Sequence, residues 1–281
     1  MLELLQQSPL IAGGYVFLAA LCVGSFLNVV IHRLPLMLEH RWQSEAAEIR
    51  NEEAPVQARL NLMVPRSRCP NCAHQITALE NLPVISWVAL RGRCSSCKAP
   101  ISPRYPIIEL CTALLSLLVF VTLGPTAKML AALGLTWALV ALTMIDFDTQ
   151  LLPDDITLPL LWAGLLVNLS GTFTSLPSAV LGAMFGYLSL WSVYWLFKLA
   201  TGREGMGYGD FKLLAALGAW MGWLSIPMIL LMSSVVGSII GVGYLIIRRE
   251  SAPFAFGPYI AIAGFITLLW GHPLMRWYLG G

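Results

Sequence analysis

The stretch Gly207-Tyr-Gly-Asp-Phe-Lys-Leu-Leu-Ala-Ala-Leu-Gly-Ala-Trp-Met-Gly-Trp-Leu224 opens with two glycines and an aspartate and continues as an apolar run. Upstream, Asp146 ends another apolar run, residues 127–145. An ionisable group beside a membrane span is costly and is functional by default. If Asp146 and Asp210 lie at one membrane face, they form the carboxylate pair that an intramembrane aspartyl protease needs.

The composition identifies lipid as the solvent of most of this chain. Of its 281 residues, 57% are hydrophobic and 11% are charged, and the mean hydropathy is +0.74. The sequence therefore predicts an all-α polytopic membrane protein with about eight transmembrane helices, most of which approach the ~20 residues that cross a hydrocarbon core. The expected spans are residues 10–31, 107–123, 127–145, 156–171, 177–197, 211–224, 226–247 and 254–270.

The basic residues predict the orientation. With both termini outside and eight crossings, fifteen of the 17 Lys and Arg residues fall at the cytoplasmic face, as the positive-inside rule requires. The net charge of +2 is thus topological and does not indicate nucleic-acid binding. The first segment carries Glu3 and lacks a small-residue cleavage site, so we expect an uncleaved span and no signal peptide. The fifteen are the ten between Arg33 and Arg104, with Lys198, Arg203, Lys212, Arg248 and Arg249; the other two are Lys128 and Arg276.

One hydrophilic insertion, residues 34–105, interrupts the membrane pattern after the first span. It begins with a charged stretch, residues 38–60, that we expect to be helical or mobile. Two Cys-x-x-Cys knuckles follow, and a shift of 25 residues superposes them. Two such turns bring four thiolates to one tetrahedral metal site, and a full tetrad makes the metal structural. The ligands are Cys69, Cys72, Cys94 and Cys97.

Other readings of the thiols are open. In the reducing cytosol stable disulfides are disfavoured, which leaves structural Zn²⁺ as our expectation, with a redox role or free thiols as alternatives. Cys22 and Cys111 lie within spans and are expected to be small apolar residues. His74, after the first knuckle, is expected to be a surface residue.

The two aspartates have the chemistry of a shared-proton pair. One ionised carboxylate activates water while one protonated carboxyl polarises the scissile carbonyl. Gly207 and Gly209 would allow unusual backbone conformations and a close approach of substrate. The alternative for Asp210 is a helix N-cap.

Other acidic residues compete for these roles. Asp148 is expected to be a loop residue near the site. Asp154 and Asp155 follow Pro153 and are expected to cap the next span. Glu109 has no evident partner, and either a packing or a functional role fits it.

The chain resembles the type IV prepilin peptidases, which are GxGD aspartyl proteases like presenilin and signal peptide peptidase. The resemblance covers nearly its whole length. It rests on Gly24-Ser-Phe-Leu-Asn-Val-Val-Ile-His-Arg-Leu-Pro35, the knuckles with Glu80-Asn-Leu-Pro83 and Ser86-Trp87 between them, Ile101-Ser-Pro-Arg-Tyr-Pro106 leading to Glu109, Asp146 with Leu152-Pro153-Asp154, and Gly205-Met-Gly-Tyr-Gly-Asp-Phe-Lys212.

The resemblance implies catalysis by Asp146 and Asp210, with Gly207, Gly209, Lys212 and Asp148 in support. It implies cleavage of prepilin or type II secretion pseudopilin leaders at the inner membrane of a bacterium, and N-methylation of the new N-terminus with S-adenosylmethionine, whose site the sequence does not reveal. The expected division is a first span (1–33), a cytoplasmic zinc insertion (34–105) and a seven-helix peptidase core (106–281).

Two other classes remain open. A membrane thiol oxidoreductase would use the Cys-x-x-Cys pairs, but these would then face the oxidising side. A transporter would use the two aspartates as ion sites at mid-membrane, whereas both lie at span ends.

Overall fold

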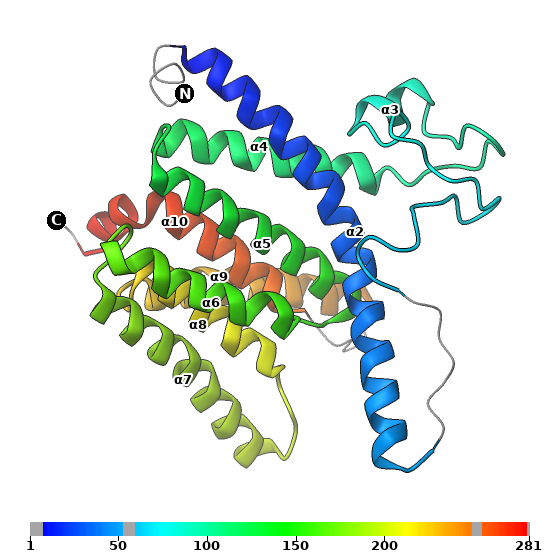
Figure 1. Ribbon diagram of the computed structural model, residues 1–281. Helices are drawn as coiled ribbons and strands as arrows, with labels where there is room; N and C mark the ends of the chain where they lie inside the picture. The colour runs from blue at the N-terminus through cyan, green and yellow to red at the C-terminus, as the bar shows by residue number, and fades with distance from the viewer. Residues whose placement is uncertain (1–7, 53–59, 249–254, 280–281) are drawn as a thin grey trace. The chain divides into compact units, whose positions relative to one another are not determined.

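The computed structural model describes residues 8–52, 60–248 and 255–279 (Figure 1). Each of the eight expected spans falls mainly on a helix in the described residues, so the predicted all-α fold is confirmed; in these ranges, β-structure is limited to two isolated bridges. Glu3, Arg59 and Arg249, which entered the signal-peptide and orientation arguments, lie outside these ranges. The helices are α2 (Pro9–Ile49), α3 (Ile85–Ala89), α4 (Arg104–Leu123), α5 (Ala127–Thr149), α6 (Asp154–Val167), η1 (Asn168–Ser170), α7 (Leu176–Thr201), α8 (Tyr208–Met221), α9 (Ser225–Arg248) and α10 (Gly257–Leu279).

The chain forms two compact units, Met1–Pro125 and Thr126–Gly281. The first unit holds α2, the cysteine-bearing insertion and α4. The second unit holds α5 to α10 and both aspartates of interest. The division predicted from the sequence, into residues 1–33, 34–105 and 106–281, has other boundaries than these two units. It stays a prediction.

In the first unit α2 packs against α4. A Cβ atom at Gly24 would lie 2.7 Å from the Cα atom of Glu109, so the two helices approach too closely there for any larger residue. Helix α2 continues to Ile49, well beyond the expected end of the span, and passes through Pro35. Leu34 and Leu38 are buried on both sides of this proline, and their packing extends the helix. The first part of the charged stretch is therefore helical.

In the second unit α8 is the central helix. It packs against α6, α7, α9 and α10, and nearly all its residues after Tyr208 and Gly209 are buried. Gly182 of α7 and Gly218 of α8 meet backbone to backbone, and a Cβ atom on either would overlap the other. Small residues of this kind let membrane helices approach closely, and dense packing then holds them.

Helices α6 and α8 run parallel. Asp154 and Lys212, near their starts, are ion-paired. Near their ends the side chain of Asn168 donates to the carbonyls of Ala219 and Trp220, both at 2.9 Å. The C-terminal end of α5 lies close to the start of α6, because only residues 150–153 connect them. The C-terminal end of α5 and the starts of α6 and α8 therefore lie at one end of the unit.

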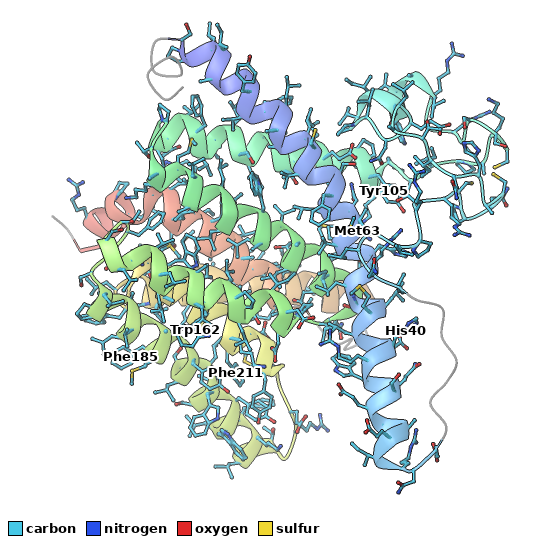
Figure 2. All side chains as sticks on the ribbon, in the orientation of Figure 1. His40, Met63, Tyr105, Trp162, Phe185 and Phe211 are labelled. Carbon is cyan, nitrogen blue, oxygen red and sulfur yellow. The ribbon has the colours of Figure 1, made fainter. Side chains whose placement is uncertain are left out.

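The outer surface suits lipid. Among the described residues, five helices are long and apolar enough to cross a membrane, namely α2, α4, α5, α7 and the Ser225–Gly243 part of α9; α6 and α8 are shorter, and the Gly257–Gly271 part of α10 is apolar but short. Large apolar side chains such as Trp162 and Phe185 are 64% and 49% exposed (Figure 2). Exposed apolar surface on this scale is unusual for a soluble monomer and normal for a membrane protein.

Candidate active site and cysteine cluster

Asp146 lies in the last turn of α5 and is 4% exposed. The helix ends three residues later, at Thr149, and the C-cap Gln150 adopts a left-handed conformation in which its N–H donates to the carbonyl of Asp146. Among the described residues, the side-chain Oδ2 of Asp146 has no hydrogen-bond partner. Burying a polar atom without a partner costs free energy, so the buried Oδ2 of Asp146 is not explained by its contribution to stability.

Asp210 lies in the first turn of α8 and is 7% exposed. Gly207 is the N-cap, so Asp210 is not the capping residue, and the alternative reading of Asp210 as an N-cap is wrong. Leu152 packs against Gly209, the neighbour of Asp210, and against Gly257, which in turn lies against Oδ2 of Asp146, so the two aspartates lie at the same end of the unit. The structure thus brings together the two aspartates singled out in the sequence; we call them the aspartate pair.

The two glycines near the aspartate pair, Gly207 and Gly209, differ in how closely other residues approach them. Neither Gly207 nor Gly209 has a positive φ, so the expected unusual backbone conformation is absent at both. A Cβ atom at Gly209 would lie 2.7 Å from Cβ of Leu152, whereas one at Gly207 would meet nothing nearer than 4.0 Å. Gly209 therefore admits the α5–α6 connection, whereas the space around Gly207 does not require a glycine.

Two residues that the sequence analysis did not place at the site are Gly257 and Leu152. Gly257 begins α10, and a Cβ atom on it would lie 2.6 Å from Oδ2 of Asp146 and 3.1 Å from Cδ1 of Leu152. Leu152 is buried between Gly209 and Gly257. The Gly257-Pro258 dipeptide, which is typical of a helix start, was the only sequence signal for the first of these.

The remaining candidate residues lie around the aspartate pair. Lys212 points to α6, where its Nζ donates to both carboxylate oxygens of Asp154 at 2.7 Å. The expectation that Asp154 and Asp155 cap this helix is wrong, because Pro153 is the N-cap of α6 and both aspartates lie in its first turn. Asp148 is exposed in the last turn of α5, so the expectation that it is a loop residue is wrong.

In the first unit the four cysteines of the knuckles form one cluster. Their sulfur atoms lie within 4.8 Å of one another; Cys69 and Cys97 are 3.8 Å apart and Cys72 and Cys94 are 3.9 Å apart. Four thiolates around Zn²⁺ at ~2.3 Å stand about 3.8 Å apart, so the cluster fits this ion. Within this cluster the backbone N–H of Ala99 lowers the pKa of Cys97 to about 6, whereas for Cys72 the lowering by the backbone N–H of His74 is outweighed by burial and the neighbouring thiols, which raise its pKa to about 11.

The two knuckles repeat in structure as in sequence. The N–H of Cys69 donates to the carbonyl of His74 at 2.9 Å, and the N–H of Cys94 donates to that of Ala99 at 2.8 Å. His74 is partly buried, with Nε2 3.3 Å from a Glu80 carboxylate oxygen and from Ser95 Oγ. The expectation that His74 is a surface residue was incomplete, because its ring also joins the two knuckles.

Glu109 is buried in α4, and its Oε2 accepts the backbone N–H of Val84 at 2.7 Å. Val84 lies between the knuckles and has a φ of 59°, which a β-branched residue rarely adopts. Arg33 of α2 donates to the carbonyls of Asn61 and Pro65 at 2.9 and 2.6 Å. Glu109 and Arg33 thus anchor the insertion on both sides of the first knuckle.

The fold and the two sites define a class of protein: a helical membrane protein with a buried aspartate pair and a separate cysteine cluster. Two family models match, the Bacterial Peptidase A24 N-terminal domain over residues 18–123 and the Type IV leader peptidase family over residues 133–242. No solved structure matches.

Curated relatives match along nearly the whole chain. The prepilin leader peptidase/N-methyltransferase of Aeromonas hydrophila is 61% identical over 283 residues, which cover 99% of this chain and 98% of the relative. The protein of the same name from Pseudomonas aeruginosa is 55% identical over 282 residues, with 99% and 97% covered. The chain therefore belongs to the type IV leader peptidase family.

Proposed function

We propose that this protein removes the leader peptide of type IV prepilins or type II secretion pseudopilins and N-methylates the residue that cleavage exposes. The observation that carries the cleavage activity is the buried aspartate pair at one end of the second unit. The relatives whose names state both activities are 61% and 55% identical along the full chain. S-adenosylmethionine supplies the methyl group, and we assign no residue to its binding.

The aspartate pair performs the hydrolysis in this proposal. At short range two carboxyls do not both ionise, so Asp146 and Asp210 share one proton. The ionised member takes a proton from water, which attacks the scissile carbonyl, while the protonated member donates a hydrogen bond to the carbonyl oxygen. In this proposal the extended substrate backbone approaches the pair near Gly207, where an added Cβ atom would meet no atom nearer than 4.0 Å.

The orientation in the proposal follows from charge. A multi-pass protein of the bacterial inner membrane with fifteen of 17 basic residues on one face places that face in the cytoplasm. The insertion is then cytoplasmic and both termini are periplasmic. The cleavage site lies on the cytoplasmic side of the substrate's apolar helix.

A co-expressed pilin tests both activities at once. Mass spectrometry of the pilin should show loss of the leader and the added mass of one methyl group on the new N-terminus. An oxidoreductase or a transporter would leave the pilin unprocessed. An intact leader in cells that contain the inserted protein would therefore contradict the proposal.

Zinc is the second component of the proposal. Purified full-length protein should carry about one Zn²⁺ per chain, because a closed tetrad binds one ion. Cys97→Ser should remove the ion and impair methylation more than cleavage, since the aspartate pair lies in the other unit. Elemental analysis measures the metal, and mass spectrometry measures the two activities.

Cys111→Ser is the matched control for this prediction. Cys111 is exposed on α4, outside the cluster, so its replacement should leave the zinc content unchanged. Metal-free protein prepared without chelator would contradict the zinc assignment.

A further inference from the structure

The two helices α6 and α8 are tied together at both ends, and the two ties differ in character. Toward the end of α8 the contacts are neutral and buried: the indole N–H of Trp220 donates to the carbonyl of Leu160, in the middle of α6, at 2.8 Å, and Asn168, which follows α6, donates to two carbonyls of α8. At the near end the tie is charged, with Lys212 bonded to both carboxylate oxygens of Asp154 at 2.7 Å.

The charged tie connects the segments that carry the aspartate pair. Lys212 follows Asp210 by two residues on α8. Asp154 begins α6, directly after the connection that leads from Asp146. Helix α5 packs against α6 and α10 and not broadly against α8, so the separation of the two aspartates depends on contacts through α6 and α10.

The packing around Leu152 leaves little room for α8 to move relative to α6 and α10. Its side chain lies between Gly209 and Gly257, and neither position has room for a Cβ atom. A shift of α8 along α6 would therefore move Gly209 against Leu152 and, with it, Asp210 relative to Asp146. Any contact that fixes the position of α8 along α6 therefore also fixes the position of Asp210 relative to Asp146.

We propose that Asp154 and Lys212 are a positioning pair for leader cleavage: their ion pair fixes the start of α8, and so Asp210, in register with the connection that follows Asp146. The proposal rests on the aspartate pair being catalytic. Lys212 acts through α6, because residues two apart on a helix do not face each other. Its ammonium group is directed to Asp154.

The solvent exposure of the Asp154–Lys212 ion pair indicates that its loss affects the reaction rate more than the stability of the fold. The side chains of Asp154 and Lys212 are 52% and 28% exposed, and a half-exposed ion pair contributes little to folding. A displacement of about 1 Å at a catalytic site, in contrast, lowers the rate by roughly 10²-fold. Loss of the pair should therefore lower kcat and leave the folded protein in place.

Kinetics of charge variants of the full-length protein test this proposal on a prepilin substrate. Asp154→Asn and Lys212→Met should each lower kcat by about 10- to 100-fold, with KM within about threefold of the wild-type value. The double variant Asp154→Lys/Lys212→Asp restores an ion pair and should recover most of the lost kcat. Lys212→Arg keeps the charge and should lose little.

The control is Asp155→Asn, which removes the same charge one residue away and leaves the Asp154–Lys212 pair intact. It should keep kcat within about threefold of wild type. Asp146→Asn and Asp210→Asn are assayed beside it. If those two variants cleave normally, the proposed aspartate pair fails; if they are inactive and the ion-pair variants are normal, only the positioning pair fails.

Three results would overturn the positioning role. The first is unchanged kcat in both single variants. The second is a rise in KM with kcat unchanged, which would indicate substrate binding. The third is a lower kcat in the single variants that the charge-swapped double variant does not recover. The double variant also covers the case in which a single variant folds poorly, because it restores the ion pair.

Discussion

Replacing Asp146 or Asp210 with asparagine should abolish leader cleavage, with kcat reduced by about 10²- to 10⁴-fold or to below detection. Asparagine has nearly the same size as aspartate but neither takes up a proton from water nor donates one to a carbonyl oxygen at neutral pH. Both groups are buried in the same unit, and the proposed mechanism needs each of them in a different protonation state. Mass spectrometry of prepilin incubated with membranes that contain each variant measures the loss.

The control for these variants is methylation of a synthetic pilin peptide that already starts at the mature residue. Such a peptide needs no cleavage, so both asparagine variants should methylate it at wild-type rates if they are folded. Near-normal prepilin cleavage by either variant would remove that aspartate from the catalytic role, and Asp148 would replace Asp146 as the candidate on α5.

Gly257→Ala should lower cleavage by roughly 10²-fold, because a small displacement at a catalytic site has an effect of this size. Its Cβ atom would lie 2.6 Å from Oδ2 of Asp146 and 3.1 Å from Leu152. The carboxyl or the start of α10 must therefore move. Initial rates on prepilin measure the effect, with thermal unfolding recorded for the same samples.

Gly134→Ala is the matched control for Gly257→Ala. Gly134 lies on α5, the helix that carries Asp146, and nothing lies within 4 Å of a Cβ atom built there. This variant should keep full activity, and its helix should gain up to about 1 kcal/mol from the better helix propensity of alanine. Equal activity of the two variants would show that Gly257 does not restrict the Asp146 carboxyl.

The sequence was sufficient to predict the helices and the two clusters of chemistry. Apolar runs of membrane length become helices because a backbone in lipid must satisfy its own hydrogen bonds, and each of the eight segments did so. The repeat of 25 residues predicted the cysteine cluster, since paired Cys-x-x-Cys turns have few other uses. The GxGD motif and Asp146 were singled out because a charged group at a span end is unusual.

The contacts between distant segments were beyond the sequence. The contact of Leu152 with Gly209 and Gly257 joins three apolar or small residues whose local patterns carry no information on their partners. Lys212 was expected near Asp210, and its ion pair with Asp154 depends on the parallel packing of α6 and α8. The continuation of α2 beyond the first span was missed because Pro35 lies in its path, and a proline usually ends or kinks a helix. Leu34 and Leu38, on either side of Pro35, are buried, and the sequence does not reveal that burial.

The shortness of α6 has a consequence for the surrounding bilayer. Its 14 residues span about 21 Å, less than the ~30 Å of a typical hydrocarbon core, and its Trp162 and Leu166 are exposed on the surface. If α6 crosses the bilayer, as the sequence predicts for this segment, the lipid beside it must compress to match it, or the helix start must sit below the headgroups. Water then approaches the end of the unit that holds Asp146 and Asp210 by a shorter path through the acyl chains than elsewhere around the protein, and the membrane's thickness becomes a determinant of how readily a hydrolytic reaction is supplied.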